Sequence, residues 1–122
     1  YYASRGLGDV YKRQVAFGTV HGIYLKEPRL DLQRVKEIYE EVKIPLVMHG
    51  GSGVHAEDYQ AAIKNGITKI NYYTYANKAG AAALRKYLNE ETQDYFLEDC
   101  IAVTTEALKE DYVRAIEIFS GQ

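Results

Sequence analysis

The segment that most constrains the fold is residues 44–53, IPLVMHGGSG, where a short apolar run changes abruptly into a glycine-rich turn. The apolar run at 46–48 is too short for a helix and is bounded by Pro45 and Gly50, so it predicts a buried parallel strand. Glycines let backbone N–H groups approach an anion closely, and a following helix presents its positive N-terminus there. His49 beside such a turn indicates a metal or proton site. Glycine-rich turns also occur without function, so the neighbouring segments must decide.

Two other segments are expected to be strands. The apolar run 15–20, VAFGTV, predicts a strand that ends at His21 and Gly22, which repeats the order of strand, histidine and glycine seen at Met48 to Gly50. Residues 67–73, ITKINYY, predict a third strand. Residues 1–14 show no helical or strand periodicity and are expected to form a loop or tail.

Helices are expected between and after these strands. Apolar residues at helical spacing predict a helix at 32–42 with Asp31 as its N-cap, and another at 56–65 that ends at Gly66. An alanine-rich helix is expected at 78–88, capped by Thr74 or Asn77, and a last helix at about 94–119.

The alternation of strands and helices predicts an α/β fold with a parallel sheet and right-handed crossovers. The same units could build part of a (β/α)8 barrel, which typically needs about 250 residues, or an open doubly wound sheet. In either architecture the C-terminal ends of the strands form the active-site face. His21, His49 and Asn71 all lie at such ends.

Two histidines from adjacent parallel strands would lie a few ångströms apart, which suits a metal ion that binds imidazole, zinc first among them. A catalytic zinc site keeps three protein ligands and one open position, so a further ligand is needed. His55 is a poor candidate because it lies past the turn, at the start of a helix. Cys100 is the only cysteine, which excludes an internal disulfide and a cysteine-based zinc cluster.

Composition indicates at most one soluble globular domain, since 26% of the 122 residues are charged and 47% are hydrophobic. With 15 Lys plus Arg against 17 Asp plus Glu and no basic block, nothing indicates a nucleic-acid partner. No apolar run is long enough to span a bilayer and no signal peptide opens the chain, so no membrane partner and a cytoplasmic location are expected.

Three motifs in order resemble the class II, zinc-dependent ketose-bisphosphate aldolases, which include fructose- and tagatose-bisphosphate aldolases: FGTVHGIY at 17–24, PLVMHGGSG at 45–53 and KINYYT at 69–74. The resemblance covers about residues 15–121 and implies strands six to eight and the following helices of a (β/α)8 TIM barrel. It implies that His21 and His49 are two of three ligands to Zn²⁺. The phosphate of the dihydroxyacetone phosphate moiety would be bound by six residues: Gly22, Gly50, Gly51, Ser52, Asn71 and Thr74.

The implied reaction is the reversible aldol cleavage of a ketose 1,6-bisphosphate to dihydroxyacetone phosphate and glyceraldehyde 3-phosphate by a full-length homo-oligomer. The family's third zinc-binding histidine and its catalytic Asp form a pair on an earlier strand that is absent here, so the 122-residue chain alone is expected to be inactive. Residues 1–14 are expected to be a non-family tail, which we interpret as a foreign junction.

Two alternatives remain open at this stage. The chain could be a non-catalytic phosphate-binding or assembly fragment of a TIM-barrel protein, or part of a phosphate-binding barrel that uses no metal. The chain also departs from the family pattern, with Leu25 before Lys26 where many relatives have lysine and with Tyr75 where an acidic residue is common. These departures leave the identity of the sugar undetermined.

Overall fold

The computed structural model describes residues 13–19, 28–90 and 94–121. The chain divides into two compact units, Tyr1–Tyr72 and Tyr73–Gln122. Among the described residues, no helix has both the length and the apolar character needed to cross a membrane.

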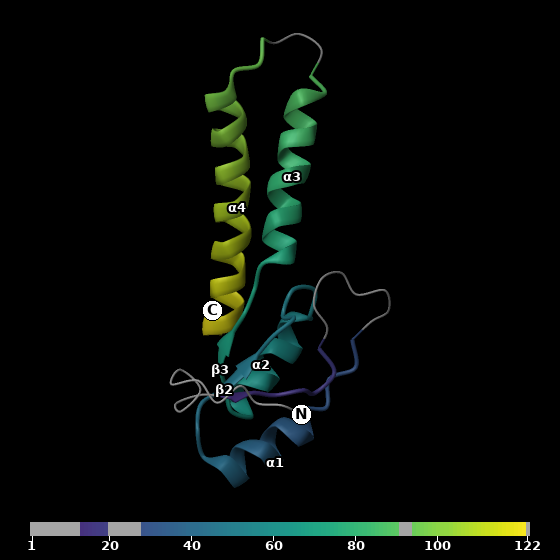
Figure 1. The fold of residues 1–122 in the computed structure, drawn as a ribbon, viewed down its shortest axis with the longest axis vertical. Coiled ribbons are helices and arrows are strands. Elements are labelled where there is room, and N and C mark those ends of the chain that lie inside the picture. The colour runs from purple at the N-terminus through teal and green to yellow at the C-terminus, as the bar shows by residue number, and fades with distance from the viewer. Residues whose placement is uncertain (1–12, 20–27, 91–93, 122) are drawn as a thin grey trace. The chain divides into compact units, whose positions relative to one another are not determined.

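The first unit contains a parallel sheet of three strands, which confirms the expected α/β class (Figure 1). Strand β2 (Leu46–Met48) lies in the centre, between β1 (Arg13–Gln14) and β3 (Ile67–Ile70). All three residues of β2 are buried, as expected for a strand covered on both faces. The predicted strand at 46–48 is therefore confirmed at both ends.

Helices α1 (Leu32–Val42) and α2 (Ala56–Lys64) contact each other and complete the first unit. The core between the helices and the sheet is formed by fully buried apolar side chains: Val35, Leu46, Met48 and Ile67. Both helices begin where the sequence predicts, and α2 ends one residue before the predicted end.

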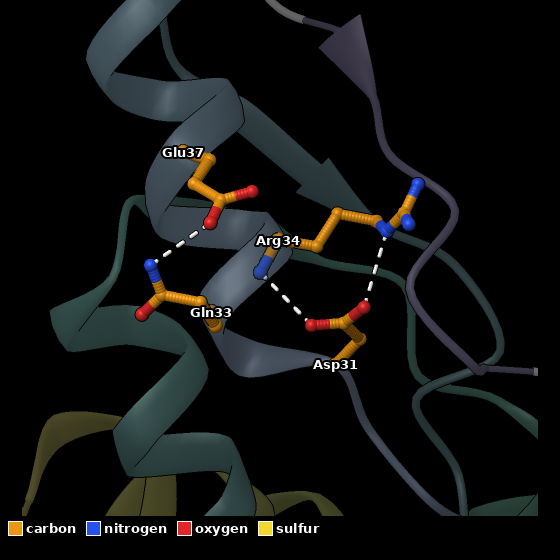
Figure 2. A network of polar contacts seen from close by, with 4 residues as sticks. All are labelled: Asp31, Gln33, Arg34 and Glu37. Carbon is orange, nitrogen blue, oxygen red and sulfur yellow. Dashed lines mark hydrogen bonds and ion pairs between the residues drawn. The ribbon is translucent and has the colours of Figure 1, made fainter.

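The N-terminus of α1 is held by the predicted cap, Asp31 (Figure 2). One carboxylate oxygen accepts a hydrogen bond from the backbone N–H of Arg34 at 3.0 Å, and the other accepts from Nε of Arg34 at 3.1 Å. These bonds stabilise the charged carboxylate, so the backbone N–H and then the side chain of Arg34 lower the pKa of Asp31. One turn further along the helix, Gln33 donates to Glu37 at 3.0 Å.

The first predicted strand, 15–20, is wrong in its position, because β1 comprises Arg13–Gln14. The backbone N–H of Val15 still donates to the carbonyl of Val47 at 3.1 Å, but the chain then leaves the sheet. Gly18 has φ 108°, and a Cβ at this position would lie 2.2 Å from the carbonyl oxygen of Arg29. Such a conformation ends a strand, and only glycine fits it. The apolar residues of this run predicted a strand, whereas Arg13 and Gln14, which were predicted to belong to a loop or tail, form it.

The third predicted strand is too long at its C-terminal end, since β3 ends at Ile70. Residues 71–73 connect it to α3 (Thr74–Leu88), which begins before the predicted residue 78. Thr74 is therefore the first helical residue, and Tyr73 occupies the N-cap position.

The second unit is a hairpin of α3 and α4 (Leu97–Ser120), which lie side by side (Figure 1). They approach closely at Gly80, where a Cβ would lie 3.1 Å from Cγ2 of Thr104 and 3.2 Å from Cγ of Leu108. The outer surface of α4 carries exposed apolar side chains, including Leu97, Ile101 and Ile116.

Candidate functional site

The candidate site begins at the C-terminal end of β2, where His49 is half-buried and the chain turns sharply. Gly50 has φ 64° and Gly53 has φ 90°, a region that glycine occupies without strain. The backbone N–H of Val54 donates to the carbonyl of Gly51 at 3.5 Å. Positive φ at the third residue of a four-residue turn is the mark of a type II turn, so residues 51–54 form one. We call residues 50–54 the glycine turn.

Gly51 lies against β3 so closely that no side chain fits at this position. A Cβ there would lie 2.8 Å from Cγ2 of Ile70 and 3.2 Å from the carbonyl oxygen of Asn71. The N–H of Gly51 donates to that same oxygen at 3.4 Å, and the carbonyl of Gly51 accepts from the hydroxyl of Tyr59 on α2. The glycine turn is thus fixed on one side by the end of β3 and on the other by α2.

Asn71 joins the ends of β2 and β3. Its backbone N–H donates to the carbonyl of Met48 at 2.9 Å, and its side-chain Nδ2 lies 2.9 Å from Nε2 of His49. The direction of this contact depends on the tautomer of His49, since Nε2 accepts in one tautomer and donates in the other, and an Asn side chain can present either its nitrogen or its oxygen. Asn71 therefore orients the ring of His49.

The structure brings five of the eight predicted site residues together in the first unit: His49, Gly50, Gly51, Ser52 and Asn71. Ser52 is buried, with 4% of its surface exposed. Thr74 belongs to the second unit. His21 and Gly22 lie outside the described residues. His55, which was expected to be a solvated residue at the start of a helix, is exposed at the N-cap of α2.

Two features of this site were missed by the reasoning from sequence. The contact between His49 and Asn71 was not predicted, although both residues were placed at strand ends. Tyr59 was counted only as part of a helix, yet it is 3% exposed and its hydroxyl reaches the glycine turn. A tyrosine at a buried position was the available signal, because a buried hydroxyl needs a hydrogen-bond partner.

The described residues supply only part of the donor set of a zinc site. Within the residues that the structure describes, no group of three or more His, Cys, Asp or Glu side chains is assembled. His49 contributes one imidazole, a ligand type that zinc prefers, at the C-terminal end of a central strand. With a metal ion on Nδ1, Nε2 would carry the proton and the amide of Asn71 would present its oxygen to it, and such contacts orient metal-bound histidines. His49 thus fits as one member of a zinc site.

The model of the family "Fructose-bisphosphate aldolase class-II" matches residues 10–122. The chain belongs to this family. The family has the TIM-barrel fold, and the small parallel sheet with its helices is consistent with part of such a barrel. The match begins at residue 10, inside the segment 1–14 that was expected to be a tail.

Solved structures of aldolases share the fold. The YdjI aldolase from Escherichia coli K12 is 31% identical, with a TM-score of 0.74 over 89% of this chain and 38% of that one. Fructose-bisphosphate aldolase (Fba) from Campylobacter jejuni is 23% identical, with a TM-score of 0.70 over 88% of this chain and 39% of that one, and shows the fold alone. The chain thus spans well under half the length of these proteins.

Proposed function

We propose that the chain is the C-terminal portion, strands six to eight, of the barrel of a zinc-dependent aldolase. β1, β2 and β3 would be those strands, in the order in which they pair. The reaction is the reversible cleavage of a ketose 1,6-bisphosphate to dihydroxyacetone phosphate and glyceraldehyde 3-phosphate. Besides membership of the family, the observation that carries the proposal is the contact between His49 and Asn71 across two adjacent strand ends, directly before the glycine turn.

The glycine turn would bind the phosphate of the substrate. Phosphate sites in TIM barrels commonly form from the loops after strands seven and eight, which correspond here to the segments after β2 and β3. Positive φ at Gly50 and Gly53 makes a concave turn of backbone N–H groups possible, and the buried Ser52 lies between them. Gly22, Gly51, Asn71 and Thr74 would complete the set of donors.

His21 and His49 would hold the zinc ion, together with a histidine from the N-terminal portion of the barrel. Bound zinc acts as a Lewis acid that polarises the substrate ketone. The role of this chain is to supply imidazole nitrogens and to orient them, and Asn71 does so for His49 through the 2.9 Å contact with Nε2. The Asp that moves the hydroxyl proton would come from the N-terminal portion.

The experiment is the substitution His49→Ala in the full-length protein, with zinc content measured by mass spectrometry and aldol cleavage measured with fructose and tagatose bisphosphates. Loss of one of three protein ligands should remove both zinc and activity. The matched control is His55→Ala, because His55 is an exposed histidine at the start of α2. This control should keep both properties. Normal zinc content and turnover in His49→Ala would refute the assignment.

A second candidate, a non-catalytic assembly fragment, is favoured by the surface of α4. Leu97, Ile101 and Ile116 are 76%, 57% and 63% exposed, and large exposed apolar side chains on one helix are typical of contact surfaces. The two candidates differ in what happens when the purified chain is mixed with the N-terminal portion of a related class II aldolase and zinc. Recovery of cleavage activity supports the enzyme, whereas association without activity supports the assembly fragment.

A further inference from the structure

One side of α4 carries an apolar stripe along most of the helix. Its members are separated by 4, 4, 3, 4 and 4 residues, a spacing that keeps them on one side of a straight helix with 3.6 residues per turn. Five of the six side chains are exposed and one, Leu108, is half-buried. We call this set the stripe, and it consists of Leu97, Ile101, Thr105, Leu108, Tyr112 and Ile116.

The stripe differs from the face of α4 that packs on α3. Thr104 belongs to the packed face, since its Cγ2 would lie 3.1 Å from a Cβ on Gly80, and Asp111 and Ala115 on α4 are buried. The five later members of the stripe each come one residue after a buried or half-buried position, and one residue is about 100° around a helix. Packing on α3 therefore leaves most of the stripe exposed.

The stripe contains no charged side chain, although α4 has six acidic and two basic residues. The solvent-facing side of a helix ordinarily carries charged residues, whereas the centres of protein interfaces are depleted of them. An exposed apolar stripe without charges is therefore typical of a contact surface.

The spacing of the stripe reads the same from either end, so the stripe is complementary to itself. A second copy of α4, antiparallel to the first and related by a two-fold axis between residues 106 and 107, would place every member of the stripe opposite another member. Contacts across a two-fold axis have this reciprocity, because residue i contacts j and j contacts i. The antiparallel direction also opposes the two helix dipoles, which a parallel pair would align. The opposing pairs would be Leu97 with the partner's Ile116, Ile101 with the partner's Tyr112, and Thr105 with the partner's Leu108.

We propose that the stripe binds the stripe of a second copy of the protein, so that two α4 helices form an antiparallel pair. The contact would extend over about 29 Å, because positions 97 and 116 are 19 residues apart and each residue adds 1.5 Å. A contact one helix wide is small for a stable complex, so we expect dissociation at micromolar concentrations. This dimer is independent of the proposed reaction, since the stripe belongs to the second unit and His49 to the first.

The first test is cross-linking between two variants of the full-length protein, Leu97→Cys and Ile116→Cys, in a background without other cysteines that includes Cys100→Ser. Leu97 and Ile116 are exposed, so neither substitution disturbs the packing on α3. A short bis-maleimide is added to each variant alone and to an equal mixture of both. In the proposed pair, position 97 of one copy is adjacent to position 116 of the other, whereas the two copies of position 97 are about 29 Å apart.

Cross-linked dimer should therefore form only in the mixture. A product from Leu97→Cys alone would show a parallel pair. Absence of product from the mixture would show that a second copy does not cover the stripe, as when the N-terminal portion of the barrel lies on it. Either result would overturn the proposal.

The second test is the substitution Ile101→Glu in the full-length protein, with the dissociation constant measured by sedimentation velocity at micromolar concentrations. The new carboxylate would be buried against the partner's Tyr112, and the two-fold axis repeats this loss, so the dimer should dissociate about 100-fold more readily. The matched control is Val113→Glu, because Val113 is 46% exposed on the same helix, compared with 57% for Ile101, but lies outside the stripe. This control should leave the dissociation constant unchanged. Equal dissociation constants for the two variants would refute the stripe as the interface.

Discussion

The substitution Gly51→Ala is expected to loosen the glycine turn from β3. The added Cβ would lie 2.8 Å from Cγ2 of Ile70 and 3.2 Å from the carbonyl oxygen of Asn71. The side chain of Ile70 can move, but the carbonyl belongs to the backbone and moves only with β3. Overpacking of this kind costs about 1–3 kcal/mol. Alanine also restricts the unfolded chain, which returns about 0.4–1 kcal/mol, so the net loss should be about 1–2 kcal/mol.

Amide hydrogen exchange of Asn71 measures this loss of stability locally. The N–H of Asn71 donates to the carbonyl of Met48 at 2.9 Å, so it exchanges only when the junction of β2 and β3 opens. A loss of about 1–2 kcal/mol should make this amide exchange roughly 5 to 30 times faster. Global unfolding would be harder to interpret, because the chain has two units.

The control is Gly80→Ala on α3. Its Cβ would meet Cγ2 of Thr104 at 3.1 Å and Cγ of Leu108 at 3.2 Å, and both atoms belong to side chains that can shift by a few tenths of an ångström. Alanine in a helix interior gains about 1 kcal/mol over glycine, so this variant should be neutral or slightly more stable. Unchanged or slower exchange of Asn71 in Gly51→Ala would refute the packing argument.

Three further predictions concern binding, pH and activity. In the full-length protein, Asn71→Ala should weaken zinc binding about 10- to 100-fold by releasing the ring of His49, as judged by competition with a chelator; unchanged zinc affinity would show that the contact is incidental. The lowered pKa of Asp31 means that its stabilisation of α1 is present above the ordinary pKa of aspartate and is lost as pH falls through the lowered value. Asp31→Asn, which also caps helices well, should remove this loss of helicity at acid pH. Circular dichroism measures helicity against pH, and an unchanged acid loss in the variant would contradict the prediction. The purified 122-residue chain with zinc should not cleave fructose or tagatose bisphosphate, and activity of the chain alone would show that the chemistry has been misplaced.

The sequence predicted the elements whose signals are local. α1 was predicted at both ends because Asp31 is a strong cap and its apolar residues keep helical spacing, and β2 because an apolar run is bounded by proline and glycine. The end of β3 and the start of α3 could not be read in this way. Tyr72 and Tyr73 favour strands, but the chain leaves the sheet after Ile70, and Tyr73 occupies the N-cap position of α3 instead.

The candidate site was predicted at the level of positions and not of contacts. The order of strand, histidine and glycine placed His49 at a strand end, and the third predicted strand placed Asn71 at another, because parallel strands present their C-terminal ends on one edge. That the two side chains meet, and that Tyr59 reaches back to Gly51, depends on register and on helix packing. Neither the register of the strands nor the packing of the helices can be predicted from one segment alone. The placement of His21, Gly22 and the zinc site remains a prediction.

The close approach of Gly18 to Arg29 has a consequence for how proteins of this kind could diversify. The backbone N–H of Asp31 donates to the carbonyl of Phe17 at 2.8 Å, and Gly18 lies against the carbonyl of Arg29. The two ends of the intervening segment are therefore joined. A loop whose ends are already joined can change in length at little cost, since each doubling adds only about 0.6 kcal/mol. Insertions after the proposed ligands His21 and Gly22 and before Arg29 should therefore leave the sheet and α1 intact. The contacts of Phe17 with Asp31 and of Gly18 with Arg29 thus separate the length of the intervening segment from the stability of the sheet, which makes the part after Gly22 a suitable place for grafting recognition segments.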